Sequence, residues 1–249
     1  ILTALEYIRE NPLTYQNYSF DCNGRFTSGE DTIRCFHGTK HGKVDFTTSF
    51  AKSCNSSFAN MGLTLSRTSF EDTLSSLYFN QSLPVDLTSN ISKVSIGTSS
   101  SDSDLIQTVI GQGTTQMTPL HLSMITSMIA NHGIMMQPYI IDRVESADGN
   151  LIKSFSPDSL GQLISEEEAD ILKNLMIAVV QEGTGTRLKA GKTGSAEYNS
   201  QSDSHAWFTG FSYDTDRPLQ VTVIMEGAGS GGEYAVPVAK RIFDQYYNG

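Results

Sequence analysis

The residues with the clearest capacity for chemistry surround Lys192, in the stretch AGKTGSAEYN (residues 190–199). Gly191-Lys192-Thr193 matches the end of a phosphate-binding loop, in which backbone N–H groups and a lysine hold phosphates. Lys192-Thr193-Gly194 matches instead the lysine-led triad of enzymes that form acyl-serine intermediates. The two interpretations imply different substrates and different folds, so other parts of the chain have to decide between them.

The phosphate-loop interpretation fails on spacing and on context. It requires a glycine five residues before Gly191, and that position holds Thr186, while Gly185 lies one residue too far away. A phosphate loop also leads into the N-terminus of a helix, where free N–H groups meet the phosphates. The residues after Lys192 are strand-like and polar, and no alternation of strands and helices surrounds them, so we reject nucleotide binding.

A second candidate for chemistry is Ser49-Phe50-Ala51-Lys52, which fits Ser-x-x-Lys. In that motif a serine nucleophile and its lysine share one helical face, within reach of proton transfer. Ser53-Cys54-Asn55 follows at once, and both motifs would have to enter one cleft from different walls. We therefore interpret Ser49 to Lys52 as a solvated helix face that matches a loose pattern.

Composition indicates a soluble globular protein and excludes several partners. The 249 residues carry a formal net charge of -10, which argues against nucleic acid or an anionic membrane surface as the main partner. No apolar run approaches the roughly 20 residues that span a bilayer. Residues 1–5 read as the inside of a helix, so we expect a piece of a longer chain. Nothing predicts a cofactor.

The cysteines and histidines carry no recognisable spacing. Cys22, Cys35 and Cys54 form no C-x-x-C pair, and Cys22 and Cys35 either pair across a loop or remain thiols. The five histidines show no H-E-x-x-H pattern. We therefore predict no metal site, and expect lone histidines such as His121 and His205 to be structural or solvated.

Periodicity and capping signals place the elements. Residues 11–43 show no period and are predicted to be loop, and residues 80–104 are polar and serine-rich. Helical spacing predicts helices over residues 1–10, 44–52, 56–65, 69–79 and 118–133. In the last of these, Thr118 would cap the helix, Pro119 would be its first residue and Gly133 would end it.

The C-terminal half changes to strands and amphipathic helices. Asp148-Gly149 predicts a hairpin turn, and Ser165 with Glu168 predicts a capping box for a helix to about Gln181. Three strands and a closing helix follow, within residues 188–198, 205–213, 219–227 and 233–246. The pattern predicts a single α+β domain over residues 1–249, with a mainly helical part over 1–138 and a sheet with flanking helices over 139–249.

Four segments occur in a specific order. They are Ser53-Cys54-Asn55, IGQGTTQMTPLHL (residues 110–122), KTGSA (residues 192–196) and AWFTGF (residues 206–211). Each is weak alone, but in this order and at these separations the chain resembles the transpeptidase domain of a class B penicillin-binding protein. The resemblance implies a five-stranded antiparallel sheet flanked by helices, beside an all-helical subdomain. IGQG and TPL are interpreted as architecture.

The resemblance also implies where the nucleophile lies. The family's Ser-x-x-Lys motif sits just before a segment like ILTALEYI, which here begins at Ile1. We therefore expect the chain to begin just after its nucleophilic serine and to lack acyl-transfer chemistry as given.

The resemblance assigns catalytic roles to three residues. Ser53 would relay protons between the missing lysine and the leaving amine. The side-chain amide of Asn55 would donate to a substrate carbonyl, and Lys192 would attract the substrate carboxylate.

Three further residues are expected to bind substrate. Thr193 would hydrogen-bond the substrate carboxylate, and Gly194 would let an extended peptide lie close to the strand edge as an added strand. The backbone N–H of Ser195 would supply half of the oxyanion hole.

The implied function is a D,D-transpeptidase that is acylated by D-Ala-D-Ala stem peptides of peptidoglycan and by β-lactams. The parent would be anchored in the bacterial membrane, with this domain on the extracytoplasmic face and in contact with other cell-wall synthesis proteins. A D,D-carboxypeptidase, a β-lactam-binding sensor and a catalytically silent domain remain as alternatives.

Overall fold

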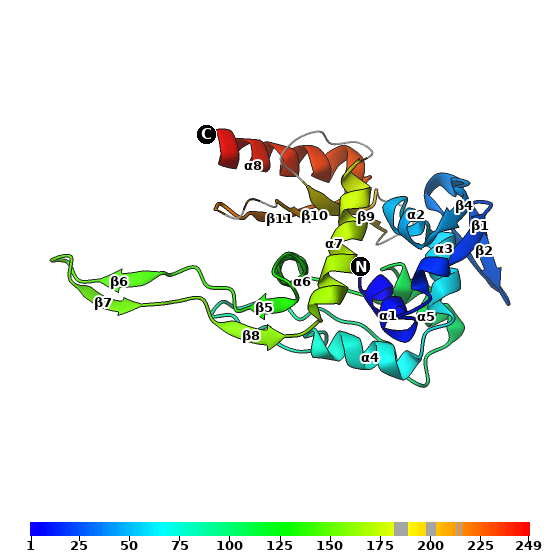
Figure 1. Ribbon diagram of the computed structural model, residues 1–249, viewed down its shortest axis with the longest axis horizontal. Helices are drawn as coiled ribbons and strands as arrows, with labels where there is room; N and C mark the ends of the chain where they lie inside the picture. The colour runs from blue at the N-terminus through cyan, green and yellow to red at the C-terminus, as the bar shows by residue number, and fades with distance from the viewer. Residues whose placement is uncertain (182–188, 198–202, 213, 215) are drawn as a thin grey trace.

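The computed structural model describes residues 1–181, 189–197, 203–212, 214 and 216–249 (Figure 1). Its N-terminal half is a body of short helices, which are α1 (Leu2–Glu10), α2 (Phe46–Ala51), α3 (Asn55–Gly62), α4 (Arg67–Ser76) and α5 (Asp102–Val109). The chain then adds a longer helical pair and a sheet, which lie side by side with this body (Figure 1).

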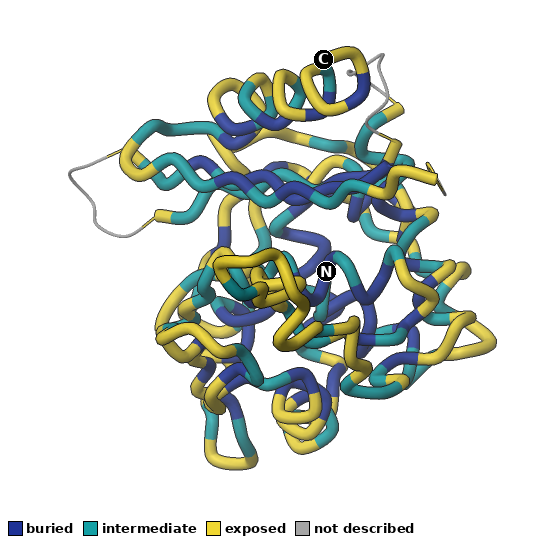
Figure 2. Tube along the Cα trace, turned by 90° about the vertical axis from the view of Figure 1, so that its left-hand side faces the viewer, coloured by how far each residue is buried: buried dark blue, intermediate teal, exposed yellow. Residues whose placement is uncertain are grey.

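The central sheet is antiparallel and lies between two layers of helix. Its strands are β9 (Ala190–Ala196), β10 (His205–Phe211) and β11 (Gln220–Met225), in the order β11-β10-β9. A short π-helix, η3 (Gly231–Ala235), and α8 (Val236–Asn248) cover one face (Figure 2). The other face packs on α6 (Pro119–Ala130) and α7 (Glu166–Gln181). Because β9 is last in the strand order, it is an edge strand of this sheet.

Alternation along β10 explains the two layers. Phe208 is 2% exposed and packs in the cluster that contains Phe243 of α8. Its neighbour Thr209 points the opposite way, as side chains do along a strand, and its hydroxyl lies 2.8 Å from that of Thr126 in α6. Lys192 pairs with Thr209 in the ladder, so its side chain leaves the sheet on the α6 side.

Local boundary signals are confirmed by the structure. The side chain of Thr118 accepts a hydrogen bond from the N–H of His121 at 3.2 Å, and Gly133 has φ of +87° after the end of α6. Ser165 and Glu168 form both bonds of the predicted capping box. His121 is fully buried and packs on Phe79, in the structural role expected of it.

The prediction of loop over residues 11–43 is wrong, and so is an all-helical first subdomain. Four short strands form two antiparallel ribbons there, paired β1-β4 and β2-β3. They are β1 (Ser19–Cys22), β2 (Arg25–Ser28), β3 (Asp31–Arg34) and β4 (Gly42–Asp45). Each strand has only four residues, too few to display a two-residue period. The pairing of β1 with β4 also joins residues distant in sequence, whereas β2 and β3 form a tight hairpin. Helix α5 was likewise not predicted. Its N-cap, Ser101, lies within residues 80–104, which were interpreted only as a polar, serine-rich stretch.

The α+β class is confirmed, but the central sheet contains three strands over the described residues, whereas five were expected. The remaining strands pair apart from it: β5 (Ile134–Met136) with β8 (Ser159–Gln162), and β6 (Arg143–Glu145) with β7 (Leu151–Ser154). Every residue of β6 and β7 is exposed, so this hairpin has no buried face with which to join a core sheet.

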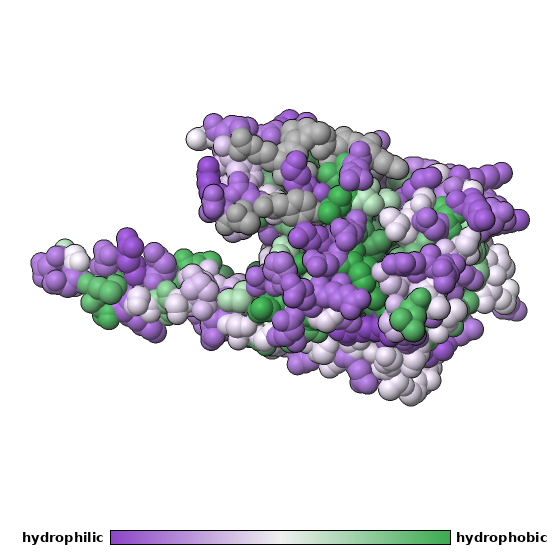
Figure 3. Space-filling model, in the orientation of Figure 1, coloured by the Kyte–Doolittle hydropathy of each residue, from purple (hydrophilic) through white to green (hydrophobic). Residues whose placement is uncertain are grey.

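The hairpin β6-β7 projects from the body and carries apolar side chains among polar ones (Figure 3). Leu151 and Ile152 are 62% and 66% exposed. The turn is the predicted one, with Gly149 at φ +80°. Among the helices that the structure describes, none combines the length and the apolar character needed to cross a bilayer.

A partly buried ion pair joins α1 to α7. The guanidinium of Arg9 binds both carboxylate oxygens of Glu168, at 2.7 and 3.2 Å, and donates to the hydroxyl of Thr73 at 2.9 Å. Both charged side chains are less than a third exposed, at 26% and 18%. This clamp fixes the first helix against the helix that supports β9.

We predict that Arg9→Ala destabilises the fold by about 2 kcal/mol, because the Glu168 carboxylate would lose its charged partner while remaining partly buried. The free energy of unfolding in urea measures the change. Arg143→Ala is the control: Arg143 is 59% exposed in its contact with Glu145, and its loss should cost less than about 0.5 kcal/mol. Equal losses in the two variants would contradict a structural role for the clamp.

Candidate active site

The turn that carries Ser53 follows helix α2 directly. Ser53 has φ of +50°, a left-handed conformation that costs an L-residue about 1 to 2 kcal/mol. Backbone bonds hold the turn, from Ser53 N–H to the Phe50 carbonyl at 3.1 Å and from Cys54 N–H to the Ser49 carbonyl at 2.9 Å. The turn thereby presents the exposed side chain of Ser53 toward strand β9.

Lys192 of β9 meets Ser53 across 139 residues of sequence. Its Nζ donates hydrogen bonds to Ser53 Oγ and to the Thr193 carbonyl, the latter at 2.9 Å. The same Nζ lies 5.7 Å from the centre of the Phe50 ring, a cation–π contact. Burial lowers the pKa of Lys192 to about 8. The predicted pair of Ser53 and Lys192 is therefore in direct contact, with a partly desolvated cation at its centre.

The start of α1 lies beside this pair. Burial, and then the charge of Lys192, lower the pKa of the Ile1 amine to about 5. The first residue of the chain is thus close enough to Lys192 for their charges to interact.

The open edge of β9 presents the backbone of Thr193 and Ser195. The carbonyl of Thr193 accepts from Lys192, and that of Ser195 accepts from the side chain of Gln112 at 3.2 Å, so both carbonyls face away from β10. In an antiparallel strand the N–H and C=O of one residue lie on the same side. The N–H of Ser195 therefore points outward at this edge, as an oxyanion donor requires.

Gln112 is a site residue that the sequence analysis missed, because IGQG was interpreted only as a turn. Gly111 and Gly113 have φ of +77° and +69°, and together they turn the chain so that the Gln112 side chain reaches β9. A polar residue between two glycines is the signal that pointed to it. Phe50, beneath Lys192, gave no signal in the sequence.

The face of β9 that carries the Ser195 side chain packs on η3. The Ser195 hydroxyl accepts a hydrogen bond from the N–H of Gly231 at 3.2 Å. A Cβ on Gly231 would lie 2.4 Å from the carbonyl oxygens of Gly194 and Trp207, so no larger residue fits. A Cβ on Gly194 would meet only the Trp207 side chain, at 3.4 Å. Packing inside the chain therefore explains the glycine at 231 but not the one at 194.

Among the hydrogen bonds of the described residues, none joins the side chain of the predicted site residue Asn55 to Ser53 or Lys192. Its amide donates to the Arg34 carbonyl at 3.1 Å. Asn55 is the first residue of α3, and its side chain is turned toward the end of strand β3. One of its two amide hydrogens remains for another acceptor.

The sequence analysis interpreted Ser49 to Lys52 as a solvated helix face, and for Ser49 this interpretation is wrong. Ser49 is fully buried, and its hydroxyl donates to the Asp45 carbonyl at 2.6 Å and lies 2.7 Å from the Ser57 hydroxyl. Lys52 alone is exposed. A buried and internally bonded hydroxyl is not accessible to a substrate.

A groove of about 450 Å³ begins where β9 ends. It is acidic, since Glu197, Asp203 and Glu233 line it together with Phe36 and His37 from the turn after β3. The groove extends the open strand edge beyond Ala196.

The chain is similar to proteins of one family. The model of the penicillin binding protein transpeptidase domain matches residues 1–244. Peptidoglycan D,D-transpeptidase PbpA of Mycolicibacterium smegmatis is 27% identical over 225 residues, which are 84% of this chain and 46% of that protein. The chain thus spans about half the length of this relative.

Two solved structures share the fold. Penicillin-binding protein A of Mycobacterium tuberculosis, as its ceftriaxone acyl-enzyme complex, superposes with a TM-score of 0.87 at 22% identity, over 98% of this chain and 58% of that one. The penicillin-binding protein PBP2 of Helicobacter pylori, in complex with MreC, gives a TM-score of 0.77 at 21% identity, over 99% of this chain and 48% of that one.

The packing of Gly231 predicts different outcomes for two glycines. Gly231→Ala should destabilise the fold by about 2 kcal/mol or more, because its Cβ would meet two backbone oxygens. Gly194→Ala should fold, with a decrease in the free energy of unfolding of less than about 1 kcal/mol. Thermal or urea unfolding of both variants tests this. A Gly194→Ala protein as unstable as Gly231→Ala would show that internal packing also requires the glycine at 194.

The desolvation of Lys192 predicts a pH dependence of stability. Its pKa falls from 10.5 to about 8 on folding, so between these values the unfolded chain binds more protons than the folded chain. Stability contributed by this group therefore rises with pH from about 8 to 10.5 and is constant below. The difference in unfolding free energy between wild type and Lys192→Met should rise across that window in urea titrations. A difference that is flat or falls there would contradict the burial of the cation.

Proposed function

The chain belongs to the penicillin-binding protein transpeptidase family, and we propose that its parent protein is a D,D-transpeptidase that cross-links peptidoglycan through acyl-serine chemistry. The observation that carries this proposal is the hydrogen bond from Lys192 to Ser53 beside the open edge of β9. A hydroxyl, a cation and an outward-facing N–H at one strand edge are the groups that acyl transfer from a peptide carboxyl terminus requires.

We propose that the nucleophilic serine and its lysine lie upstream of Ile1 in the parent protein. The proximity of the start of α1 to Lys192 supports this. Residues that precede Ile1 would enter the site from the N-terminus of α1, opposite β9. A Ser-x-x-Lys motif there would place both side chains on one helical face, next to the Ser53 hydroxyl.

Each site residue then has a role in the reaction. Lys192 would attract the terminal carboxylate of the donor peptide and hold the Ser53 hydroxyl, which relays the proton to the leaving D-alanine amine. The hydroxyl of Thr193 would bind the same carboxylate. The second amide hydrogen of Asn55 would bind a carbonyl of the stem peptide. The N–H of Ser195 would stabilise the oxyanion, a contribution worth about 3 to 4 kcal/mol in other enzymes.

The donor peptide would lie along β9 as an added strand. The free edge supplies backbone groups for pairing, and Gly194 offers no side chain to obstruct a close approach. Because the groove beyond Ala196 is lined by Glu197, Asp203 and Glu233, it suits the part of a stem peptide that carries an amine.

We further propose that β-lactams acylate the same serine, as mimics of D-Ala-D-Ala. The parent would be anchored in the cytoplasmic membrane with this domain on the extracytoplasmic face, where peptidoglycan is assembled, and would work beside other cell-wall synthesis proteins. The family membership supports these assignments, as does the likeness to penicillin-binding protein A in its ceftriaxone acyl-enzyme complex and to PBP2 in its complex with MreC.

We predict that the parent protein, extended upstream to include Ser-x-x-Lys, is labelled covalently by a fluorescent penicillin, and that the 249-residue chain is not. In the parent, Lys192→Ala should slow acylation about 100-fold or more, because the carboxylate loses its cation and Ser53 its partner. Lys52→Ala is the matched control and should label at the wild-type rate, since Lys52 is exposed outside the site.

Two results would overturn the proposal. Wild-type labelling of the Lys192→Ala variant would remove Lys192 from the site, and labelling of the 249-residue chain at Ser49 would place the nucleophile in the rejected motif. With a D-Ala-D-Ala peptide and an amine acceptor, mass spectrometry should detect the cross-linked product. Hydrolysis alone would identify a carboxypeptidase instead.

A further inference from the structure

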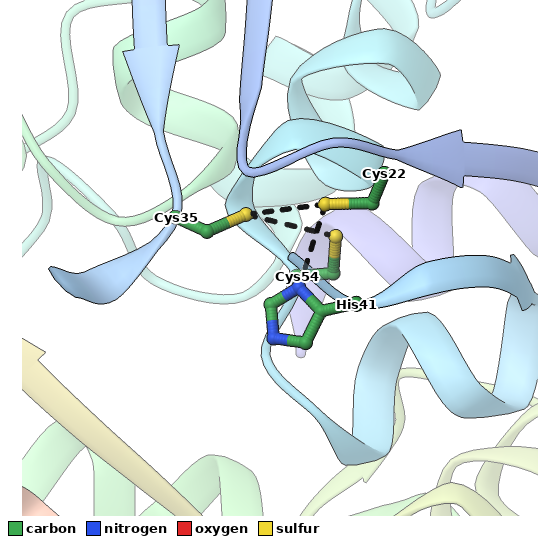
Figure 4. Close-up of side chains that lie close together, drawn as sticks. All are labelled: Cys22, Cys35, His41 and Cys54. Carbon is green, nitrogen blue, oxygen red and sulfur yellow. Dashed lines mark hydrogen bonds between the residues drawn. The ribbon is translucent and has the colours of Figure 1, made fainter. Parts of the chain in front are cut away.

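Three cysteines and a histidine from four separate segments converge in the ribbon region (Figure 4). Cys22 ends β1, Cys35 follows β3, His41 precedes β4 and Cys54 caps the N-terminus of α3. Their potential ligand atoms all lie within 4.8 Å of one another. The three cysteines are buried thiols, with no disulfide between them.

The distances match those of a tetrahedral zinc site. Zn–S bonds of about 2.3 Å and Zn–N bonds of about 2.05 Å place two sulfurs about 3.8 Å apart, and a sulfur and a nitrogen about 3.6 Å apart. The Sγ atoms of Cys22 and Cys35 are 3.6 Å apart, and those of Cys35 and Cys54 are 3.8 Å apart. His41 Nδ1 lies 3.5 Å from Cys22 Sγ. These three distances match a filled coordination sphere, and the remaining ones are all within 4.8 Å.

The backbone holds these positions. The N–H of Cys35 donates to the Gly24 carbonyl at 3.0 Å, which joins the turn after Cys22 to the turn after Cys35. A Cβ on Gly24 would lie 2.5 Å from the Gly38 carbonyl oxygen, so the two turns are in backbone contact. Ser56 Oγ lies 3.1 Å from Cys35 Sγ, the kind of outer hydrogen bond that orients a metal ligand.

The two ribbons bury few apolar side chains of their own, and Ile33 is the one that packs on Ala59 and Ile106. In residues 19–45, all of which the structure describes, Ile33 and Val44 are the only apolar side chains buried besides the cysteines. Small structures with so little core generally depend on disulfides or a metal. A cluster of three thiols and an imidazole at the centre of this region fits a metal better than a purely apolar contact.

We propose that Cys22, Cys35, His41 and Cys54 bind one Zn²⁺ in a closed structural site that fixes the two ribbons against α3. Four protein ligands with no open position are typical of structural rather than catalytic zinc. The sequence analysis predicted no metal because it searched for short motifs. The intervals between these ligands are 13, 6 and 13 residues, and only the fold brings them together.

Metal analysis of the 249-residue chain, purified without chelator, should give one zinc per chain. After zinc removal under reducing conditions, titration with Co²⁺ should produce the sulfur-to-cobalt charge-transfer band and the visible ligand-field bands of a tetrahedral thiolate site, and added Zn²⁺ should abolish both. The thiols should resist Ellman's reagent until chelator is added, and all three should then react.

Variants at the two histidines of this region distinguish a histidine that binds the zinc from one that only lies near it. His41→Ala should weaken zinc binding by more than about 100-fold, since loss of an outer-shell partner alone costs 10–100-fold. His37→Ala is the control: His37 is exposed in the same turn and lies outside the cluster, so it should bind zinc as wild type does. Zinc removal should lower the melting temperature of wild type but not that of His41→Ala.

The proposal fails if the wild-type chain shows no cobalt charge-transfer band. This test uses the wild-type chain alone and does not depend on the folding of a variant. It also fails if only one thiol reacts after chelation without reductant, because a Cys22–Cys35 disulfide would then replace the site. Equal zinc affinity in His41→Ala and His37→Ala would remove the histidine from it.

Discussion

The candidate active site depends on one interaction, the hydrogen bond between the partly desolvated Lys192 ammonium and the Ser53 hydroxyl. It joins an edge strand to a turn in the helical body, so both must be held rigidly. The sheet holds Lys192 by its ladder pairing with Thr209, which in turn bonds to α6 through Thr126. The turn holds Ser53 in a left-handed conformation through two backbone bonds.

The elements that the sequence predicted well are those specified by neighbouring residues. The cap at Thr118, the capping box of Ser165 and Glu168, and the hairpin turn at Gly149 each depend on a few adjacent side chains. The four strands between residues 19 and 45 were missed because each has only four residues; β1 also pairs with the distant β4, whereas β2 and β3 form a tight hairpin. Strand pairing is decided by tertiary structure, which periodicity alone does not report.

In the candidate active site, too, local patterns predicted some residues, and tertiary contacts decided the others. The residue types and their order pointed to Ser53 and Lys192, which the fold brings into contact. The position of the Asn55 side chain could not be predicted from the motif, because Asn55 is the first residue of α3 and its amide donates to the Arg34 carbonyl. Gln112 and Phe50 also touch the site only through tertiary packing. Motif order thus pointed to the pair of Ser53 and Lys192, while the contacts around the pair required the three-dimensional structure.

The turn Ser53-Cys54-Asn55 connects the two sites, because its three side chains point in three directions. Ser53 reaches Lys192 on the sheet, Cys54 enters the thiol cluster and Asn55 binds the end of β3. The chain turns between α2 and α3, and this turn points the three consecutive side chains in different directions. A metal bound through Cys54 would anchor the middle of the turn, and the backbone that positions the Ser53 hydroxyl would lose its freedom to shift. The ribbons would then support the active site without supplying an atom to the reaction.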